Sequence, residues 1–273
     1  MKTMWKGALN FGLVNVPIKM HAATEKKTIK FKYLHKDCHA PIEYKRVCSA
    51  CQKEISWEEI VRGYEYEPGK YVEIDEQELE SVPDEKSKTI DILDFVNLAE
   101  IDPVYYEKTY YLSPQETGER AYLLLKKTLK ENKKVAICKV MIRSKESLAC
   151  VRVYDNVLTL ETMFFPDEVR KAKEAIPGDM NVTVNDKELE MANKLIESLT
   201  SEFDPQKYKD DYREALLELI RTKIEGKEIK TPKLEKEDDK VVDLMEALKE
   251  SVKLVEGDKD GYEKRNEKRD ETG

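Results

Sequence analysis

Between residues 135 and 165 the chain passes through three strand-like segments with very short links between them. VAICKVMIR, SLACVRVY and VLTLETMFF are rich in apolar and β-branched residues, and the links SKE and DN are polar. Parallel neighbours need a crossover of about a dozen residues or more, so links this short allow only antiparallel pairing. This region therefore predicts an antiparallel meander, which is typical of a β-barrel or β-sandwich.

Other parts of the first 165 residues also favour strands. Residues 3–22 indicate two strands joined by a tight turn, and residues 29–35 alternate apolar and polar side chains as a half-buried strand does. A helix is expected over residues 117–131, with Tyr122, Leu125 and Leu129 on one face. Further strands are expected over 71–74, 88–97 and 101–112.

From Pro166 onward the sequence pattern is helical. Asn185 and Glu188 are spaced as a capping box, and Asp204 followed by Pro205 is typical of the start of a second helix. The apolar stripes expected on the two helices are Leu189, Ala192, Ile196, Leu199 and Phe203, and then Tyr208, Tyr212, Leu216, Leu219 and Ile220. With the strands before them, these helices give an α+β chain.

The sequence predicts a folded core over residues 1–227 that includes a helical arm over 184–227. Residues 228–239 lack apolar periodicity and contain a proline, so they are expected to be a linker. Residues 240–257 form a short amphipathic helix that ends at a glycine, and residues 258–273 are almost wholly polar and expected to be disordered.

The charge of the chain is distributed unevenly. Its net charge of −8 argues by itself against a nucleic-acid binder. Residues 1–62 and 108–173 each carry a net charge of +6, whereas residues 63–107 and 174–273 carry −11 and −9. The two basic blocks are compatible with a phosphate-facing surface, and also with ordinary surface charge.

Several features predict a cytoplasmic protein. The sequence has no run of about 18 apolar residues, so a transmembrane helix is not expected. Its N-terminal segment lacks the apolar region and the cleavage site of a signal peptide. Five cysteines, two of them in a CxxC pair, favour reduced thiols or a metal site over a disulfide framework.

His35, Cys38, Cys48 and Cys51 are arranged H-x2-C-x9-C-x2-C. Each pair can curl as a knuckle that presents two ligands to one tetrahedral zinc ion. His39 competes with His35 as the fourth ligand. No open coordination position is evident, so the zinc would be structural. The alternative is that these are metal-free surface residues.

The sequence contains none of the common catalytic or nucleotide-binding motifs. A P-loop, a dinucleotide-binding glycine motif, a nucleophile elbow and an HExxH motif are all missing. Asp75, Asp91 and Asp94 could be imagined as ligands in a metal-dependent nuclease, but a solvated acidic face is the simpler interpretation. We therefore predict a binding protein with no catalytic site and no nucleotide cofactor.

Several segments of the chain resemble prokaryotic Ku. They include MWKGALNFGLVNVPIKMHAAT, LHKDCHAPIEYKRVCSACQKEI, GYEYEPGKYVEI, DFVNLAEIDPVYYEKTYYL, MIRSKESLACVRVY and FDPQKYKDDYREALLELIRTKIEGK. The segments follow one another in colinear order over about 225 residues. The resemblance is specific, although no single motif carries it.

This resemblance implies a Ku-type β-barrel core with a DNA-encircling bridge, and a zinc ribbon near residues 33–57. It implies a ring-shaped homodimer that binds double-stranded DNA ends without sequence preference in non-homologous end joining, at the nucleoid. DNA contacts of this kind are made to phosphates by Lys and Arg. The candidates in the matching segments are Lys6, Lys19, Lys30, Lys32, Lys45, Arg46, Arg143, Lys145 and Arg152.

The resemblance also implies roles for the helices. Those over 184–227 would form the dimer, unless they pack on their own barrel. The helix over 240–257 would dock on an ATP-dependent DNA ligase of the ligase D type through Val242, Met245, Leu248 and Val252. Two other functions stay open from the sequence, a sequence-specific zinc-ribbon regulator and a metal-dependent end nuclease.

Overall fold

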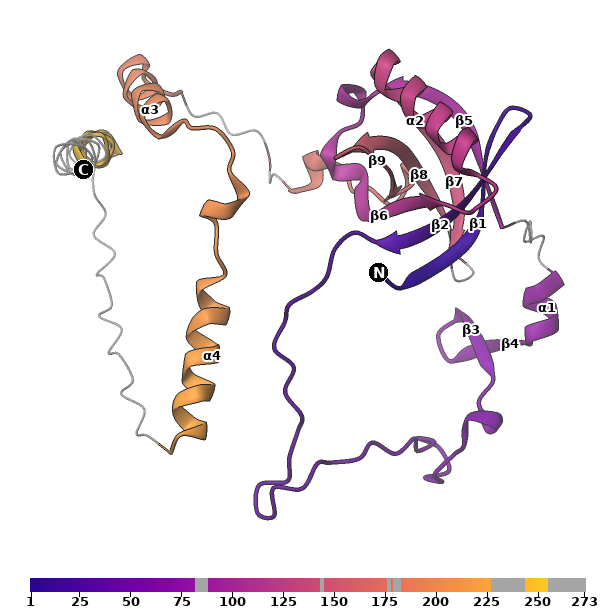
Figure 1. Cartoon of the computed structure of the whole chain (residues 1–273). Coiled ribbons are helices and arrows are strands. Elements are labelled where there is room, and N and C mark those ends of the chain that lie inside the picture. Colours follow the sequence, from indigo (N-terminus) through magenta and orange to yellow (C-terminus); the bar gives the residue numbers. More distant parts are fainter. Residues whose placement is uncertain (82–87, 143–144, 176–177, 179–182, 227–243, 255–273) are drawn as a thin grey trace. The chain divides into compact units, whose positions relative to one another are not determined.

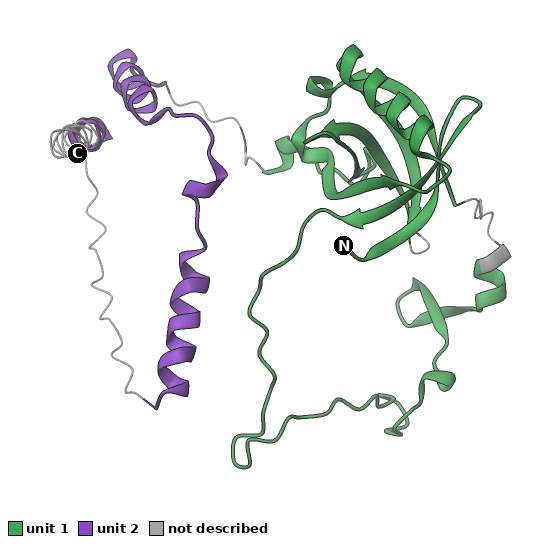
Figure 2. Ribbon diagram, in the orientation of Figure 1, with its two compact units in different colours: residues 1–175 green, residues 176–273 purple. Residues whose placement is uncertain are grey.

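The computed structural model describes residues 1–81, 88–142, 145–175, 178, 183–226 and 244–254. The chain divides into two compact units, Met1–Ala175 and Ile176–Gly273, which have different colours in Figure 2. All the described strands lie in the first unit, and the two longest helices after the barrel lie in the second (Figure 1). Within the described residues, no helix is both long and apolar enough to span a membrane.

The first unit is built on a closed barrel of seven strands in the order β1-β2-β6-β9-β8-β7-β5 (Figure 1). Neighbouring strands are antiparallel except β1 and β5, which close the barrel in parallel. The strands are β1 (Thr3–Phe11), β2 (Val14–Ala22), β5 (Thr89–Asn97), β6 (Tyr106–Pro114), β7 (Lys134–Ile142), β8 (Lys145–Tyr154) and β9 (Val157–Met163). The predicted α+β fold with a β-barrel core is confirmed.

Strands β7, β8 and β9 form the predicted antiparallel meander, in continuous register. Asp155 and Asn156 link β8 to β9, and both have positive φ (42° and 64°), as a two-residue type I′ turn requires. In the β1–β2 hairpin, Gly12 has a φ of 57°, which a glycine adopts without strain. Local turn chemistry thus fixes the register of both hairpins.

Alternate residues of every barrel strand point inward and form the hydrophobic core, which follows from the two-residue period of a strand. The fully buried members include Leu9, Ile18, Met20, Ile90, Leu112, Val140, Val151, Leu158 and Leu160. The residues between them in sequence face outward, so polar side chains on the strands gather on the outer surface of the barrel.

Helix α2 (Glu119–Asn132) completes the core with Tyr122, Leu125 and Leu129, the three residues predicted to share one face. The Tyr122 hydroxyl donates a hydrogen bond to the carbonyl oxygen of Leu112 and accepts one from the N–H of Leu158, both at 2.8 Å. Leu112 and Leu158 are partners across β6 and β9. The buried hydroxyl therefore joins the helix to this strand pair.

Between β2 and β5 the chain leaves the barrel. Strands β3 (Arg62–Glu67) and β4 (Lys70–Ile74) pair as a separate two-stranded sheet, and α1 (Glu76–Ser81) follows. The predicted strand over 29–35 is wrong. Residues 24–33 have no regular secondary structure, and Leu34 forms only an isolated bridge with Pro41. The alternating pattern has no core to pack against there, since almost all of these side chains are exposed.

Several short 3-10 turns adjust the predicted boundaries. Strand β6 begins at Tyr106, later than predicted, because Asp102 caps a 3-10 turn by accepting a hydrogen bond from the N–H of Val104. These turns are η1 (Trp57–Glu59), η2 (Leu98–Glu100), η3 (Pro103–Tyr105), η4 (Ala172–Ala175) and η5 (Pro205–Lys207).

The second unit contains α3 (Asp186–Leu199) and α4 (Asp211–Ile224). The predicted capping box of Asn185 and Glu188 is confirmed. Asp204 caps only the turn η5, and α4 is capped instead by Asp210, whose carboxylate accepts a hydrogen bond from the N–H of Arg213. Residues 244–254 are also helical, within the predicted helix over 240–257. The predicted linker and tail, 228–239 and 258–273, lie outside the described residues.

The helices of this unit bury little of their apolar surface. On α3 the half-buried apolar side chains are Met191, Ala192 and Leu195, whereas the rest of the predicted stripe, Leu189, Ile196, Leu199 and also Phe203 beyond the helix, is exposed. On α4, Leu216 and Ile220 are half-buried, and Tyr212 and Ile224 are exposed. Exposed apolar surface on this scale is typical of an interaction site.

Replacing Tyr122 by Phe is expected to destabilise the barrel by about 1–3 kcal/mol, because the buried Leu158 N–H and Leu112 carbonyl lose their shared partner. Chemical denaturation followed by circular dichroism measures the free energy of unfolding. Tyr33→Phe, at an exposed position, is the control and should leave that free energy unchanged. Equal stability of the two variants would contradict the assigned role of the hydroxyl.

Candidate nucleic-acid interface

Lys6 on β1 and Lys19 on β2 lie directly opposite one another in the strand ladder. Both face outward, because their neighbours in sequence alternate with them and point into the core. Neither ammonium group has an ion-pair partner in the part of the chain that the structure describes. Like charges placed opposite one another destabilise a strand pair. A phosphate bound between them would relieve that repulsion.

The outer face stays polar from β2 to β8. His21 lies opposite Tyr111, and Tyr111 lies opposite Thr159, which is fully buried and is itself the partner of Arg152. The His21 ring Nε2 is 2.9 Å from the hydroxyl of Ser113, which itself faces Lys19. Sequence patterns alone do not point to His21, Tyr111 or Ser113 as parts of this face. The pairing of β2 with β6 joins segments about 90 residues apart, so no local sequence pattern predicts it.

Arg152 is held inside this surface by a buried carboxylate. Its Nε donates a hydrogen bond of 2.9 Å to Glu161, whose side chain is 7% exposed, and its guanidinium lies 5.3 Å from the centroid of the Tyr154 ring. The hydrogen bond from Arg152 to Glu161 raises the pKa of the arginine further. Because the ion pair already balances its charge, Arg152 stabilises the barrel wall and has less of its guanidinium free for phosphate.

Two uncharged groups surround that ion pair. Burial, with a smaller effect from the charge of Glu161, raises the pKa of the Cys150 thiol to about 12. Burial and the neighbouring Cys150 raise the pKa of Tyr106 to about 12 as well. Both side chains are therefore neutral at physiological pH. This cluster of Tyr106, Cys150, Arg152 and Glu161 is suited to structural packing, and it offers no reactive thiolate.

The other basic candidates are spread over the first unit. Lys145 pairs with Glu168 at 3.1 Å and Lys45 pairs with Glu54 at 2.8 Å. These exposed ion pairs contribute little stability, so a phosphate can displace either carboxylate. The remaining candidates are Lys30 and Lys32, exposed in the segment without regular structure, Arg46, stacked on Trp57, and Arg143, which lies outside the described residues.

The four candidate zinc ligands lie in two turns that have the same pattern of backbone hydrogen bonds. In the first, the N–H of His35 donates to the carbonyl of Ala40 and the N–H of His39 donates to that of His35, each at 2.9 Å. In the second, the N–H of Cys48 donates to the carbonyl of Lys53 and the N–H of Gln52 donates to that of Cys48, also at 2.9 Å. His39 and Gln52 have φ values of 55° and 57°. Residues 34–41 and 47–54 are therefore equivalent knuckles.

Each knuckle brings its own two candidate ligands together. The Nδ1 atom of His35 is 3.1 Å from the Sγ atom of Cys38. Hydrogen bonds from the backbone N–H groups of Cys51 and Ala50, and then from the Cys51 thiol, lower the pKa of the Cys48 thiol. That shift favours the thiolate, which is the metal-binding form. Among the residues with described positions, no three His, Cys, Asp or Glu side chains are grouped closely enough to hold a metal ion.

Comparison with known proteins gives consistent matches. The family model described as the Ku70/Ku80 beta-barrel domain matches residues 10–191. The protein named "Non-homologous end joining protein Ku" of Bacillus subtilis (strain 168) is 47% identical over 256 residues, which are 92% of this chain and 82% of the relative. Proteins of the same name from Desulfitobacterium hafniense and Heliobacterium modesticaldum are 47% and 46% identical. Those matches cover 94% and 93% of this chain, and 89% and 92% of the relatives.

Proposed function

The chain belongs to the Ku family, and we propose that it binds double-stranded DNA ends without sequence preference during non-homologous end joining. The observation that carries the proposal is similarity over more than nine-tenths of the chain to proteins named for that process. A protein of this kind holds broken ends for repair. We propose that it does so without a catalytic site of its own and without a nucleotide cofactor.

The physical basis proposed for binding is contact with phosphates. Sequence-independent affinity comes from Lys and Arg that displace counterions from the DNA backbone. The opposed pair Lys6 and Lys19 supplies two such charges on the barrel, and Lys30 and Lys32 supply two more on the segment between β2 and β3. Of the nine candidates from the sequence, these four and Arg46, which stacks on Trp57, carry charges with no carboxylate partner among the described residues.

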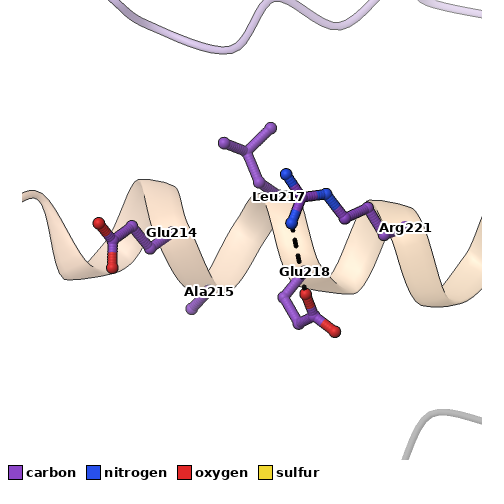
Figure 3. A pocket seen from close by; sticks show the side chains of 5 residues that line it. All are labelled: Glu214, Ala215, Leu217, Glu218 and Arg221. Atoms are coloured by element: carbon purple, nitrogen blue, oxygen red, sulfur yellow. Dashed lines mark ion pairs between the residues drawn. The ribbon is translucent and has the colours of Figure 1, made fainter.

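The active form proposed is a homodimer that uses α4. Tyr212 and Ile224 are 78% and 80% exposed, and Leu216 and Ile220 lie between them at helical spacing. Beside this stripe is a hollow of about 530 Å³, shown in Figure 3. It is lined by Glu214, Ala215, Leu217, Glu218 and Arg221, and the last two form an ion pair of 3.8 Å. A second copy can cover such a face in an isologous contact.

A structural zinc ion held by His35, Cys38, Cys48 and Cys51 is part of the proposal. The equivalence of the two knuckles supports this set, since His35 occupies the position of Cys48 and Cys38 that of Cys51. His39 occupies the position of Gln52, whose left-handed backbone turns the chain. A bound zinc ion would tie the two knuckles to each other and stabilise the segment between the barrel and β3.

Recruitment of an ATP-dependent ligase of the ligase D type is proposed for the helix over 244–254. Val252 is only 8% exposed and Met245 and Leu248 are half-buried, so this face is largely covered within the chain and must be released to bind. Val242 lies outside the described residues. Leu248→Asp should abolish capture of the purified ligase, and Leu244→Asp, at an exposed position, should not. Equal capture of the ligase by the two variants would contradict this role of the helix.

Linear duplex DNA should bind much more tightly than a covalently closed circle of the same sequence, with no added cofactor. A gel shift with both substrates measures this, and affinity should fall steeply with salt because counterions are released. Equal binding to circles would favour the sequence-specific regulator. Cleavage on addition of magnesium would favour the end nuclease.

The double substitution Lys6→Gln, Lys19→Gln should weaken binding to linear DNA and reduce the slope of log affinity against log salt by roughly 1–2, at about 0.9 per phosphate contact. Lys70→Gln is the matched control, because Lys70 pairs with Glu67 in an acidic part of the chain. A slope that falls equally in both variants would contradict the assignment of Lys6 and Lys19.

Leu216→Asp combined with Ile220→Asp should convert the homodimer to a monomer of 31.8 kDa, because two charges would be buried in the apolar contact. Light scattering after gel filtration measures the mass. Lys223→Asp places a charge on an exposed position of the same helix and should leave the dimer intact. A wild-type chain that is monomeric at micromolar concentration would refute the dimer.

The chain purified under reducing conditions should contain about one zinc ion per protomer by elemental analysis. Cys51→Ser and His35→Ala should each lose most of it, and His39→Ala should retain it. Loss of zinc from the His39 variant but not from the His35 variant would reverse the assignment of the fourth ligand. A wild-type chain that contains no zinc would contradict the proposed zinc site.

A further inference from the structure

Trp57 is one of only two tryptophans in the chain, and its side chain lies almost wholly in solvent, with 67% exposed. It begins the turn η1. The guanidinium of Arg46 lies over its ring, 4.0 Å from the centroid. Arg46 is itself fixed, because its carbonyl accepts a hydrogen bond of 2.9 Å from the N–H of Ile55 beside the second knuckle. The two planar groups therefore form a stack with one indole face covered by arginine and the other open.

The surroundings of this stack contain no hydrophobic core. No residue from 24 to 73 is buried, and Ile55 is among the few that are even half-buried. Seven large aromatic side chains are nevertheless exposed there, namely Phe31, Tyr33, Tyr44, Trp57, Tyr64, Tyr66 and Tyr71. Aromatic side chains contribute large burial energies to folded cores, and here none is used for that purpose. These aromatics are therefore available to a ligand.

The segment that precedes Trp57 is positively charged, although Glu58 and Glu59 follow Trp57 directly in η1. Residues 24–57 contain eight Lys and Arg against four Asp and Glu, a net charge of +4. Lysines alternate directly with aromatics in the run Lys30, Phe31, Lys32, Tyr33. Lysine is depleted in the core of protein–protein interfaces. Aromatic platforms interleaved with basic side chains are the features with which proteins hold single-stranded nucleic acid.

We propose that Arg46 and Trp57 form a stacking platform for an unpaired nucleobase, so that the chain holds the single-stranded overhang of a DNA end as well as its duplex. The base stacks on the open face of the indole, and Arg46 remains on the other face. The neighbouring Lys45 and Lys53 are both exposed in the same basic segment, and they can contact the overhang phosphates once Lys45 exchanges its ion pair with Glu54 for a phosphate. The inference rests on the proposed function, because it is the duplex that brings an overhang to the platform.

A Trp5→Phe background makes Trp57 the only tryptophan, since Trp5 packs at the edge of the barrel core. Two duplexes of equal length, one blunt and one with a short 3′ overhang of deoxythymidines, are titrated while tryptophan fluorescence and DNA anisotropy are recorded. The overhang duplex should quench Trp57 and the blunt duplex should not. The overhang duplex should also bind roughly tenfold more tightly, as expected for one stacked base.

The variant Trp57→Ala, in the otherwise unchanged chain, should lose the roughly tenfold preference for the overhang and keep its affinity for the blunt duplex. Trp57→Phe should restore part of the preference, because a smaller ring still stacks. Tyr66→Ala is the matched control, an exposed aromatic of the acidic hairpin β3–β4, and should behave as the parent chain. Unchanged blunt-end affinity shows that each variant is folded.

Equal affinity for both duplexes, without quenching, would overturn the inference and leave duplex-end binding intact. Quenching of Trp57 that depends on protein concentration in the absence of DNA would also overturn it, because a second copy would then cover the indole. Failure to bind either duplex, together with quenching of Trp57 by an added single-stranded oligonucleotide of deoxythymidines, would refute the proposed function and support the platform.

Discussion

The parallel pairing of β1 with β5 is the contact on which the rest of the structure depends. It closes the barrel over only three residue pairs, Ala8–Thr89, Leu9–Ile90 and Asn10–Asp91. An Asn10–Asp91 hydrogen bond of 2.6 Å and one of 2.8 Å from the Ala8 N–H to the Lys88 carbonyl reinforce it. Strands β2 and β5 both pair with β1, so the segment between them begins and ends beside the same strand. The knuckles and the β3–β4 hairpin therefore belong to a loop with fixed ends.

Closure also determines where charge can be placed. A closed barrel has no free edges and directs every second side chain outward, so the basic residues on its strands become a surface and not a set of scattered positions. Lys6 and Lys19 meet across one ladder, and His21 connects them to β6. The net charge of the chain is negative, yet neither of these two lysines has a carboxylate partner among the described residues. Average charge is thus a poor guide to what this surface binds.

Local patterns predicted the meander, the buried face of α2 and the capping box of α3, because turns and helix stripes depend on residues close in sequence. The strand predicted over 29–35 was wrong, since alternation stabilises a strand only where a neighbour and a core are present. The α3 stripe was correct only in part, because the helix half-buries Met191 and Leu195 while Ile196 is exposed. The ion pair of Arg152 with Glu161 could not be predicted, because the two residues are diagonal neighbours and not direct partners across β8 and β9, and the burial of Glu161 depends on the folded barrel.

The parts of the chain without a core are the parts for which ligands are proposed. An isolated two-stranded sheet and knuckles whose side chains are almost all exposed bury too little apolar surface to offset the entropy of ordering them. The same holds for α4, whose stripe is largely in water. Zinc, DNA and a second subunit would each supply the missing interactions. A ligand that binds only the ordered form of a segment stabilises that form by mass action. Folding of these segments and binding at their sites are therefore coupled. The barrel, with its own closed core, is the part that folds independently of that equilibrium.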